Sequence, residues 1–143
     1  MVTPSTLDQM VCFQLYAASR AMTAVYRPLL EPHGLTYPQL LVLVALWDHG
    51  PTTVRDLGTR LKLDSGTLSP LIKRLETAGH VRRDRGNSDE RTVVVSLTES
   101  GLRLRDQLAG LPEQIACAVD LTVDEFHQLI HLLSRIPQKG TTA

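Results

Sequence analysis

Apolar residues recur every three or four positions near the start of the chain, from Leu7 to Leu30. This spacing places them on one face of a helix, so the segment is predicted to form one long helix. Pro28 is expected to bend or end that helix, because proline lacks the N–H that an interior turn requires. Residues Tyr37–His49 are predicted to form a second helix, which is apolar on most sides and is therefore expected to be buried.

The middle of the chain changes from helical spacing to segments typical of strands. Thr53–Leu61 and Ser65–Ala78 are predicted to be two short amphipathic helices, joined by a tight turn over residues 62–64. Residues 81–85 and 92–97 no longer follow the helical spacing and are predicted to form two strands. The polar residues between these strands are expected to form the exposed tip of a hairpin.

Helical spacing returns after the second predicted strand. One helix is predicted over residues 98–108, and the helical pattern resumes beyond Gly110 and Pro112. Thr122 and Glu125 are spaced as in a capping box, in which each side chain accepts a hydrogen bond from the other residue's backbone N–H. They are therefore expected to open a last helix, and the residues that follow it, 137–143, are expected to be a disordered tail.

Two short helices followed by a basic hairpin are typical of a winged helix-turn-helix, here over residues 52–97. The predicted fold class is mainly α with a small β-hairpin, and residues 1–143 are expected to form a single domain. The second helix of such a pair enters the major groove of DNA with its N-terminal half, where hydroxyl groups contact base edges and basic side chains reach phosphates. We therefore predict that this helix contacts double-stranded DNA through Ser65, Gly66, Thr67, Ser69, Pro70, Lys73 and Arg74.

The charge distribution points to the same function. The chain has no net charge, but residues 52–105 carry eleven Lys and Arg against seven Asp and Glu, and the other residues carry four against eight. A basic middle between acidic flanks is typical of a DNA-binding module. Arg85 and Arg91 of the hairpin are predicted to contact DNA, since arginine suits the narrow minor groove of A·T-rich sequences. Asp89 is expected to hold the guanidinium of Arg91 in place.

All three tyrosines lie within the first 37 residues, together with Cys12. Tyr16 is one helical turn from Cys12, so the two share a face of the first helix. In a straight helix, Tyr26 lies about 21 Å from Cys12. It can therefore contact Cys12 only from a second, antiparallel copy of the chain. Tyr37 can approach the same place. Phenol hydroxyls that donate to sulfur favour the thiolate, which is the form that reacts with peroxides.

The same residues have an ordinary interpretation. A lone cysteine on an apolar helix face is most often a small core residue, and tyrosines near a helix interface most often serve packing. The residues alone therefore leave both interpretations open. The other thiol of the chain is Cys117, within the predicted helical region near the C-terminus.

The predicted wing resembles that of a known family. Asp89-Glu90-Arg91, followed by residues 93–98, is similar to the wing signature of the MarR family, and the resemblance covers nearly the whole chain. It implies a homodimer whose terminal helices, at 7–35 and 105–136, intertwine. It also implies that the two recognition helices of this dimer meet a pseudo-palindromic operator.

Three further segments resemble the organic hydroperoxide resistance regulators (OhrR) within the MarR family; they are residues 12–20, 26–30 and 34–39. This resemblance implies that Cys12 is the peroxidatic cysteine. It implies that Tyr26 and Tyr37 of the other subunit stabilise the Cys12 thiolate, with Tyr16 as a neighbour. Cys117 resembles the resolving cysteine of the two-cysteine type, which implies an intersubunit disulfide. The implied function is a repressor that binds DNA when reduced and is released when an organic hydroperoxide oxidises Cys12.

Two other functions stay open at this stage. The first is a MarR-type repressor that is released by a small phenolic or other ligand, with Cys12 incidental. The second is a thiol peroxidase, which would not explain the predicted winged helix-turn-helix at residues 52–97. We therefore expect a regulator rather than an enzyme, and no cofactor.

His127 and His131 lie one helical turn apart, a spacing able to bind a metal. The segment lacks the glutamate of a zinc protease, so an ordinary solvated or packed pair is expected and no metal site is predicted. The first residues show no secretory signal, and the longest apolar run is too short to cross a bilayer. A cytoplasmic location without membrane contact is therefore expected.

Overall fold

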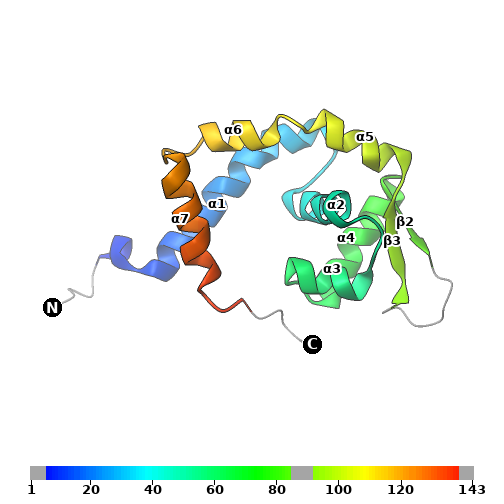
Figure 1. The fold of residues 1–143 in the computed structure, drawn as a ribbon, viewed down its shortest axis with the longest axis horizontal. Coiled ribbons are helices and arrows are strands. Elements are labelled where there is room, and N and C mark those ends of the chain that lie inside the picture. The colour runs from blue at the N-terminus through cyan, green and yellow to red at the C-terminus, as the bar shows by residue number, and fades with distance from the viewer. Residues whose placement is uncertain (1–5, 85–91, 139–143) are drawn as a thin grey trace.

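The computed structural model describes residues 6–84 and 92–138. Figure 1 shows that helices α1, α6 and α7 lie on one side of the molecule, while α2, α3, α4 and the small sheet lie on the other, with α5 leading from the sheet to α6. The elements are η1 (Leu7–Gln9), α1 (Val11–Leu30), η2 (Glu31–His33), α2 (Tyr37–His49), β1 (Thr52–Thr53), α3 (Val54–Leu61), α4 (Ser65–Thr77), β2 (Val81–Asp84), β3 (Val94–Leu97), α5 (Glu99–Gln107), α6 (Leu111–Cys117) and α7 (Val123–Ser134).

The prediction of one continuous helix from Leu7 is wrong at its start. Met10 adopts an extended conformation, which separates the 3-10 helix η1 from α1. The side chain of Gln14 donates a 2.9 Å hydrogen bond to the backbone oxygen of Asp8, so η1 is held against the first turn of α1. Pro28 lies inside α1, and the helix ends soon after it, at Leu30.

Helix α2 has the bounds that the sequence predicts. A capping box opens it: the Thr36 side chain accepts from the backbone N–H of Gln39 at 3.4 Å, and the Gln39 side chain accepts from the N–H of Thr36 at 3.0 Å. The helix is buried as expected, with Val42, Leu43 and Leu46 almost inaccessible to solvent. It packs against α1, α3, α4, α5 and β3.

Helices α3 and α4 form the predicted helix-turn-helix. Lys62 adopts a left-handed conformation with φ 57°, which ends α3. The turn then folds back so closely that a Cβ on Gly58 would lie 2.9 Å from the backbone oxygen of Leu63. Leu57 and Leu68, one from each helix, are fully buried between the helices and the core.

The sheet has a third strand that the sequence did not reveal. Its order is β1-β3-β2, and both pairs are antiparallel. Strand β1 has two residues, which is too short for an alternating pattern to be recognised. Strands β2 and β3 pair from Val81 opposite Leu97 to Asp84 opposite Val94, and the residues at the hairpin tip, 85–91, lie outside the described part.

The C-terminal helices connect the sheet to α1. Thr122 and Glu125 form the predicted capping box of α7, with hydrogen bonds of 3.1 and 2.9 Å. Of the predicted disordered tail, only Pro137 and Gln138 fall within the described residues. The side chain of Gln138 accepts a 2.5 Å hydrogen bond from the amine of Lys62, in the turn between α3 and α4.

The start of α5 is packed tightly against α2, β3 and the residue that precedes β2, His80. The backbone oxygen of Gly101 accepts a 3.0 Å hydrogen bond from the indole N–H of Trp47 on α2. A Cβ on Gly101 would overlap the backbone oxygen of His80 and approach the Leu97 side chain to 3.0 Å. This position therefore requires a glycine because of space rather than backbone conformation.

Substitution of Gly101 by alanine is expected to lower the free energy of unfolding by about 2 kcal/mol, because the backbone around His80 must move. Urea unfolding at fixed protein concentration measures this. Gly110→Ala is the matched control, since an added Cβ there meets nothing within 4 Å. Equal stabilities for the two variants would contradict the close approach at Gly101.

Candidate DNA interface and redox site

The predicted DNA-contacting residues of α4 lie mainly on one exposed face. Its opposite face carries Leu68, Leu71, Ile72 and Leu75, which are buried in the core. The described structure exposes Ser65, Gly66, Thr67, Pro70, Lys73 and Arg74, while Ser69 is partly buried. The N-terminal half of α4 is therefore a solvent-facing surface with small polar side chains first and two cations one turn later.

Asp64 fixes the first turn of this helix. One oxygen of its carboxylate accepts a 2.7 Å hydrogen bond from the backbone N–H of Thr67. Hydrogen bonds from the backbone and side chain of Thr67 lower the pKa of Asp64 below its ordinary value. The charged cap thus holds the end of α4 that faces outward, in agreement with the preference of helix N-termini for negative charge.

Asp64→Ala is expected to lower the melting temperature at neutral pH, because the first turn of α4 loses its cap. Since the pKa of Asp64 is lowered by folding, its stabilisation is present above the ordinary carboxyl pKa and is lost as the pH falls through the lowered value. The difference in melting temperature between wild type and Asp64→Ala should therefore shrink in acid. Asp64→Asn keeps the acceptor without the charge, and it serves as the control. A difference that does not change with pH would contradict a charged cap.

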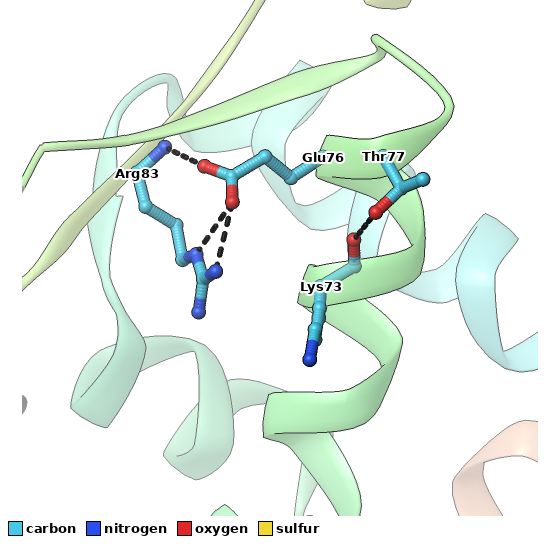
Figure 2. A network of polar contacts seen from close by, with 4 residues as sticks. All are labelled: Lys73, Glu76, Thr77 and Arg83. Atoms are coloured by element: carbon cyan, nitrogen blue, oxygen red, sulfur yellow. Dashed lines mark hydrogen bonds and ion pairs between the residues drawn. The ribbon is translucent and has the colours of Figure 1, made fainter.

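The stem of the wing is basic, but its two described arginines differ in their surroundings. Arg82 is exposed, whereas Arg83 is partly buried and forms an ion pair with Glu76 of α4 at 2.8 Å. Figure 2 shows the Glu76 side chain reaching from α4 to Arg83. Arg85, Asp89 and Arg91 lie outside the described residues, so their contacts with DNA stay predictions.

The structure places the two distal tyrosines side by side. The rings of Tyr26, on α1, and Tyr37, the first residue of α2, are 4.7 Å apart between centroids and tilted by 50°. Burial raises the pKa of Tyr26 above its ordinary value, and the neighbouring Tyr37 adds to this rise. The Tyr26 phenol is therefore protonated at neutral pH and available as a hydrogen-bond donor.

Cys12 lies in the first turn of α1 and is exposed, so it is not a core residue of the single chain. Tyr16, one turn later, is 61% exposed, and the guanidinium of Arg20 lies 5.4 Å from its ring centroid. Cys117 is the last residue of α6, and its thiol is also free and exposed. Within one chain, α1 separates Cys12 from the Tyr26–Tyr37 pair, as the helical spacing requires.

A cavity of about 460 Å³ lies where α1, α2, α5, α6 and α7 meet. Its walls are mostly apolar, and Tyr26, Trp47 and Arg105 are among the residues that line it. Sequence reasoning missed this cavity, because its lining comes from helices far apart in the chain and no local pattern marks it. It shares Tyr26 with the tyrosine pair.

Neither a metal cluster nor a membrane span is found in the described parts. Among residues 6–84 and 92–138, no three His, Cys, Asp or Glu side chains gather as they would around a metal ion. His127 and His131 lie exposed on α7. No described helix is both long and apolar enough to cross a bilayer.

Comparisons with known proteins agree with this arrangement. Residues 24–108 match the family described as transcriptional regulator SarA/Rot. The regulator TtmR of Methylorubrum extorquens is 47% identical over 92% of this chain and 67% of its own length. The organic hydroperoxide resistance transcriptional regulator of Bacillus subtilis is 48% identical over 76% of this chain and 74% of its own length.

Solved structures of the regulator AbfR have the same fold. Reduced AbfR bound to DNA superposes with a TM-score of 0.75 at 35% identity, covering 90% of each chain. AbfR with its disulfide formed gives a TM-score of 0.66 at 35% identity, covering 90% of this chain and 93% of that chain.

The fold and the exposed recognition helix thus define a winged-helix transcriptional regulator of the MarR type, and not an enzyme. The chain belongs to the SarA/Rot family of transcriptional regulators. The resemblance to the MarR family and to the organic hydroperoxide resistance regulators is confirmed.

Proposed function

We propose that this protein is a homodimeric repressor that binds operator DNA when reduced and is released when an organic hydroperoxide oxidises Cys12. The observation that carries the proposal is the pairing of Tyr26 with Tyr37, which holds a partly buried, protonated phenol in a chain whose Cys12 thiol is exposed elsewhere on α1. The Bacillus subtilis relative is named for organic hydroperoxide resistance, and AbfR has been solved in reduced and disulfide forms.

Exposed apolar side chains at both ends of the chain support the dimer. Large hydrophobic residues project from η1, α1 and α7 into solvent, which is unusual for a monomer. They include Leu7, Met10, Val11, Leu15, Val123, Leu129, Ile130, Leu132 and Ile136. A second copy would cover these faces, and an antiparallel α1 of that copy would bring its tyrosine pair toward Cys12.

The oxidation needs only the hydroperoxide and two thiols. The Cys12 thiolate attacks one peroxide oxygen: an S–O bond forms, the O–O bond breaks, and the alkoxide leaves and takes up a proton to become an alcohol. The thiol of Cys117 of the partner subunit then attacks the sulfenic sulfur. An S–S bond forms, the S–O bond breaks, and the hydroxide leaves with the thiol proton as water. The two cysteines supply the two electrons that reduce the peroxide.

The new bond joins α6 of one chain to α1 of the other, and both elements adjoin the core that carries α4. Release requires that the oxidised dimer bind the operator less tightly than the reduced dimer. A thousandfold difference corresponds to a coupling free energy of about 4 kcal/mol. A change in the distance between the two recognition helices accounts for this loss of affinity, since both helices must meet half-sites at a set distance.

Treatment of the reduced dimer with cumene hydroperoxide tests the redox step, using an operator selected from random duplex DNA. The wild type is expected to form a disulfide-linked dimer on a non-reducing gel and to lose operator binding, and dithiothreitol should restore both. Cys117→Ser should form no linked dimer, and Cys12→Ser should stay bound to the operator. Peroxide-driven release that persists in Cys12→Ser would overturn the proposal.

Removal of the Tyr26 hydroxyl tests its role at the thiolate. Tyr26→Phe keeps the ring beside Tyr37 but loses the donor. Oxidation of Cys12 at neutral pH is expected to slow roughly tenfold, which is the scale of one hydrogen bond to a charged group. The rate is followed by trapping the sulfenic acid in a Cys117→Ser background. The control is the rate at which Cys117 is alkylated in a Cys12→Ser background, and Tyr26→Phe should not change this rate. If Tyr26→Phe also leaves the oxidation rate of Cys12 unchanged, the Tyr26 phenol is ruled out as a hydrogen-bond donor to Cys12.

The cavity favours a second candidate function. Its volume of about 460 Å³ and its apolar walls suit a small aromatic molecule, and the phenol of Tyr26 and the guanidinium of Arg105 offer polar contacts. A repressor that such a ligand releases would dissociate from DNA when the ligand is added without oxidant, and the Cys12→Ser variant would do the same. This behaviour separates the two candidates.

A further inference from the structure

One carboxylate joins the recognition helix to the wing. Glu76, near the end of α4, accepts three hydrogen bonds from Arg83 of β2. Oxygen Oε2 accepts from the backbone N–H at 3.0 Å, and Oε1 accepts from Nε at 3.1 Å and from one terminal nitrogen at 2.8 Å. Figure 2 shows this arrangement, with the amine of Lys73 directed away from the carboxylate.

The backbone hydrogen bond has a structural reason. Strand β2 is at the edge of the sheet, since the order is β1-β3-β2. Arg83 lies opposite Val95 of β3, but its N–H is directed to Glu76 and therefore away from β3. An edge strand leaves every second N–H without a partner in the sheet. Glu76 satisfies one of these donors, so it fixes the position of the strand as well as that of a side chain.

The same contacts hold the guanidinium of Arg83 against Glu76. Its side chain is 19% exposed and that of Glu76 is 35% exposed, whereas neighbouring Arg82 is exposed to solvent. A planar guanidinium held by one carboxylate is directed toward α4 rather than outward. Arg83 therefore differs from Arg82, its neighbour on the same strand, although the charge count treats the two alike.

We propose that Glu76 is a positioning residue for DNA binding, which holds the wing at a set distance from the recognition helix, and that Arg83 serves this contact instead of binding a phosphate. The inference rests on the proposed reading of DNA by α4 and the wing. The two parts must enter adjacent grooves together, and a wing that moves freely would lose entropy on binding.

The direction in which operator affinity changes when Glu76 is neutralised distinguishes a positioning role from a purely electrostatic effect. Glu76 is an anion close to the DNA-facing surface, so its charge alone weakens binding to phosphates. Neutralising it should strengthen operator binding if Glu76 acts only through charge. It should weaken operator binding if Glu76 positions the wing. The two effects have opposite directions, and one variant separates them.

Glu76→Gln is expected to weaken operator binding by the dimer about fivefold, which is within the range for the loss of two partly exposed ion pairs, one in each subunit. Fluorescence anisotropy with the reduced protein measures this, and circular dichroism and sizing confirm the fold and the oligomeric state. Glu113→Gln on α6 removes one negative charge away from α4 and should leave affinity unchanged. Unchanged or tighter binding by Glu76→Gln would overturn the proposal.

The dependence of affinity on salt supplies a second readout. If Arg83 contacts no phosphate, Arg83→Ala should weaken binding without changing the slope of log K against log salt concentration. A slope reduced by about 1.8, which is about 0.9 for each subunit of the dimer, would show a lost phosphate contact and would overturn the assignment.

A double-mutant cycle completes the test. If the two residues act through each other, Glu76→Ala combined with Arg83→Ala should weaken binding no more than either single change does. Additive losses would show that they act separately and would contradict the proposal. Failure of DNA reading itself would show in the wild-type protein, whereas failure of this inference shows only in the variants.

Discussion

The burial of α2 is the constraint on which the other elements depend. Helices α1, α3, α4 and α5 and strand β3 all pack against it, and Val42, Leu43 and Leu46 are withdrawn almost completely from water. Burying one such side chain contributes about 1.5–3 kcal/mol, so this helix is not free to shift independently of its neighbours. The ring of its first residue, Tyr37, packs at a tilt against that of Tyr26 on α1, and Trp47 near its other end donates a hydrogen bond to the backbone oxygen of Gly101 on α5. The tyrosine pair and helices α3 and α4 thus share one buried element, α2.

The helices were predictable because local chemistry sets their ends. Thr36, Asp64 and Thr122 each cap the helix that the pattern places after them. The errors arose where tertiary pairing decides the structure. Strand β1 exists only because Thr52 and Thr53 find Val95 and Val94 beside them, and two residues cannot show a period. The break at Met10 is accompanied by a local side-chain hydrogen bond from Gln14 to the backbone of Asp8, which apolar spacing does not record.

The candidate site was predictable in its residue types but not in its partners. Helical periodicity placed Lys73 and Arg74 on the exposed face of α4, because Leu71, Ile72 and Leu75 fill the buried face. Spacing also showed that Cys12 and Tyr26 cannot meet within one chain. The pairing of Glu76 with Arg83 was hidden, since a count of charges assigns every arginine to the basic surface. The cavity could not be predicted either, because the residues that line it come from helices far apart in the sequence.

In the proposed redox mechanism, the position of the tyrosine pair explains why sensing would need two copies of the chain. A phenol can donate a hydrogen bond to a thiolate only if it keeps its proton, as an ordinary tyrosine does at neutral pH, and partial burial raises the pKa of Tyr26 further. Burial comes from the core around α2, whereas Cys12 has to stay accessible to a peroxide. One straight helix cannot satisfy both requirements at one point, since its core-facing end is far from its exposed end. An antiparallel pair of α1 helices can satisfy them, because the buried end of one then lies beside the exposed end of the other. In the proposed dimer, the arrangement that positions two recognition helices therefore also creates the environment of the reactive sulfur.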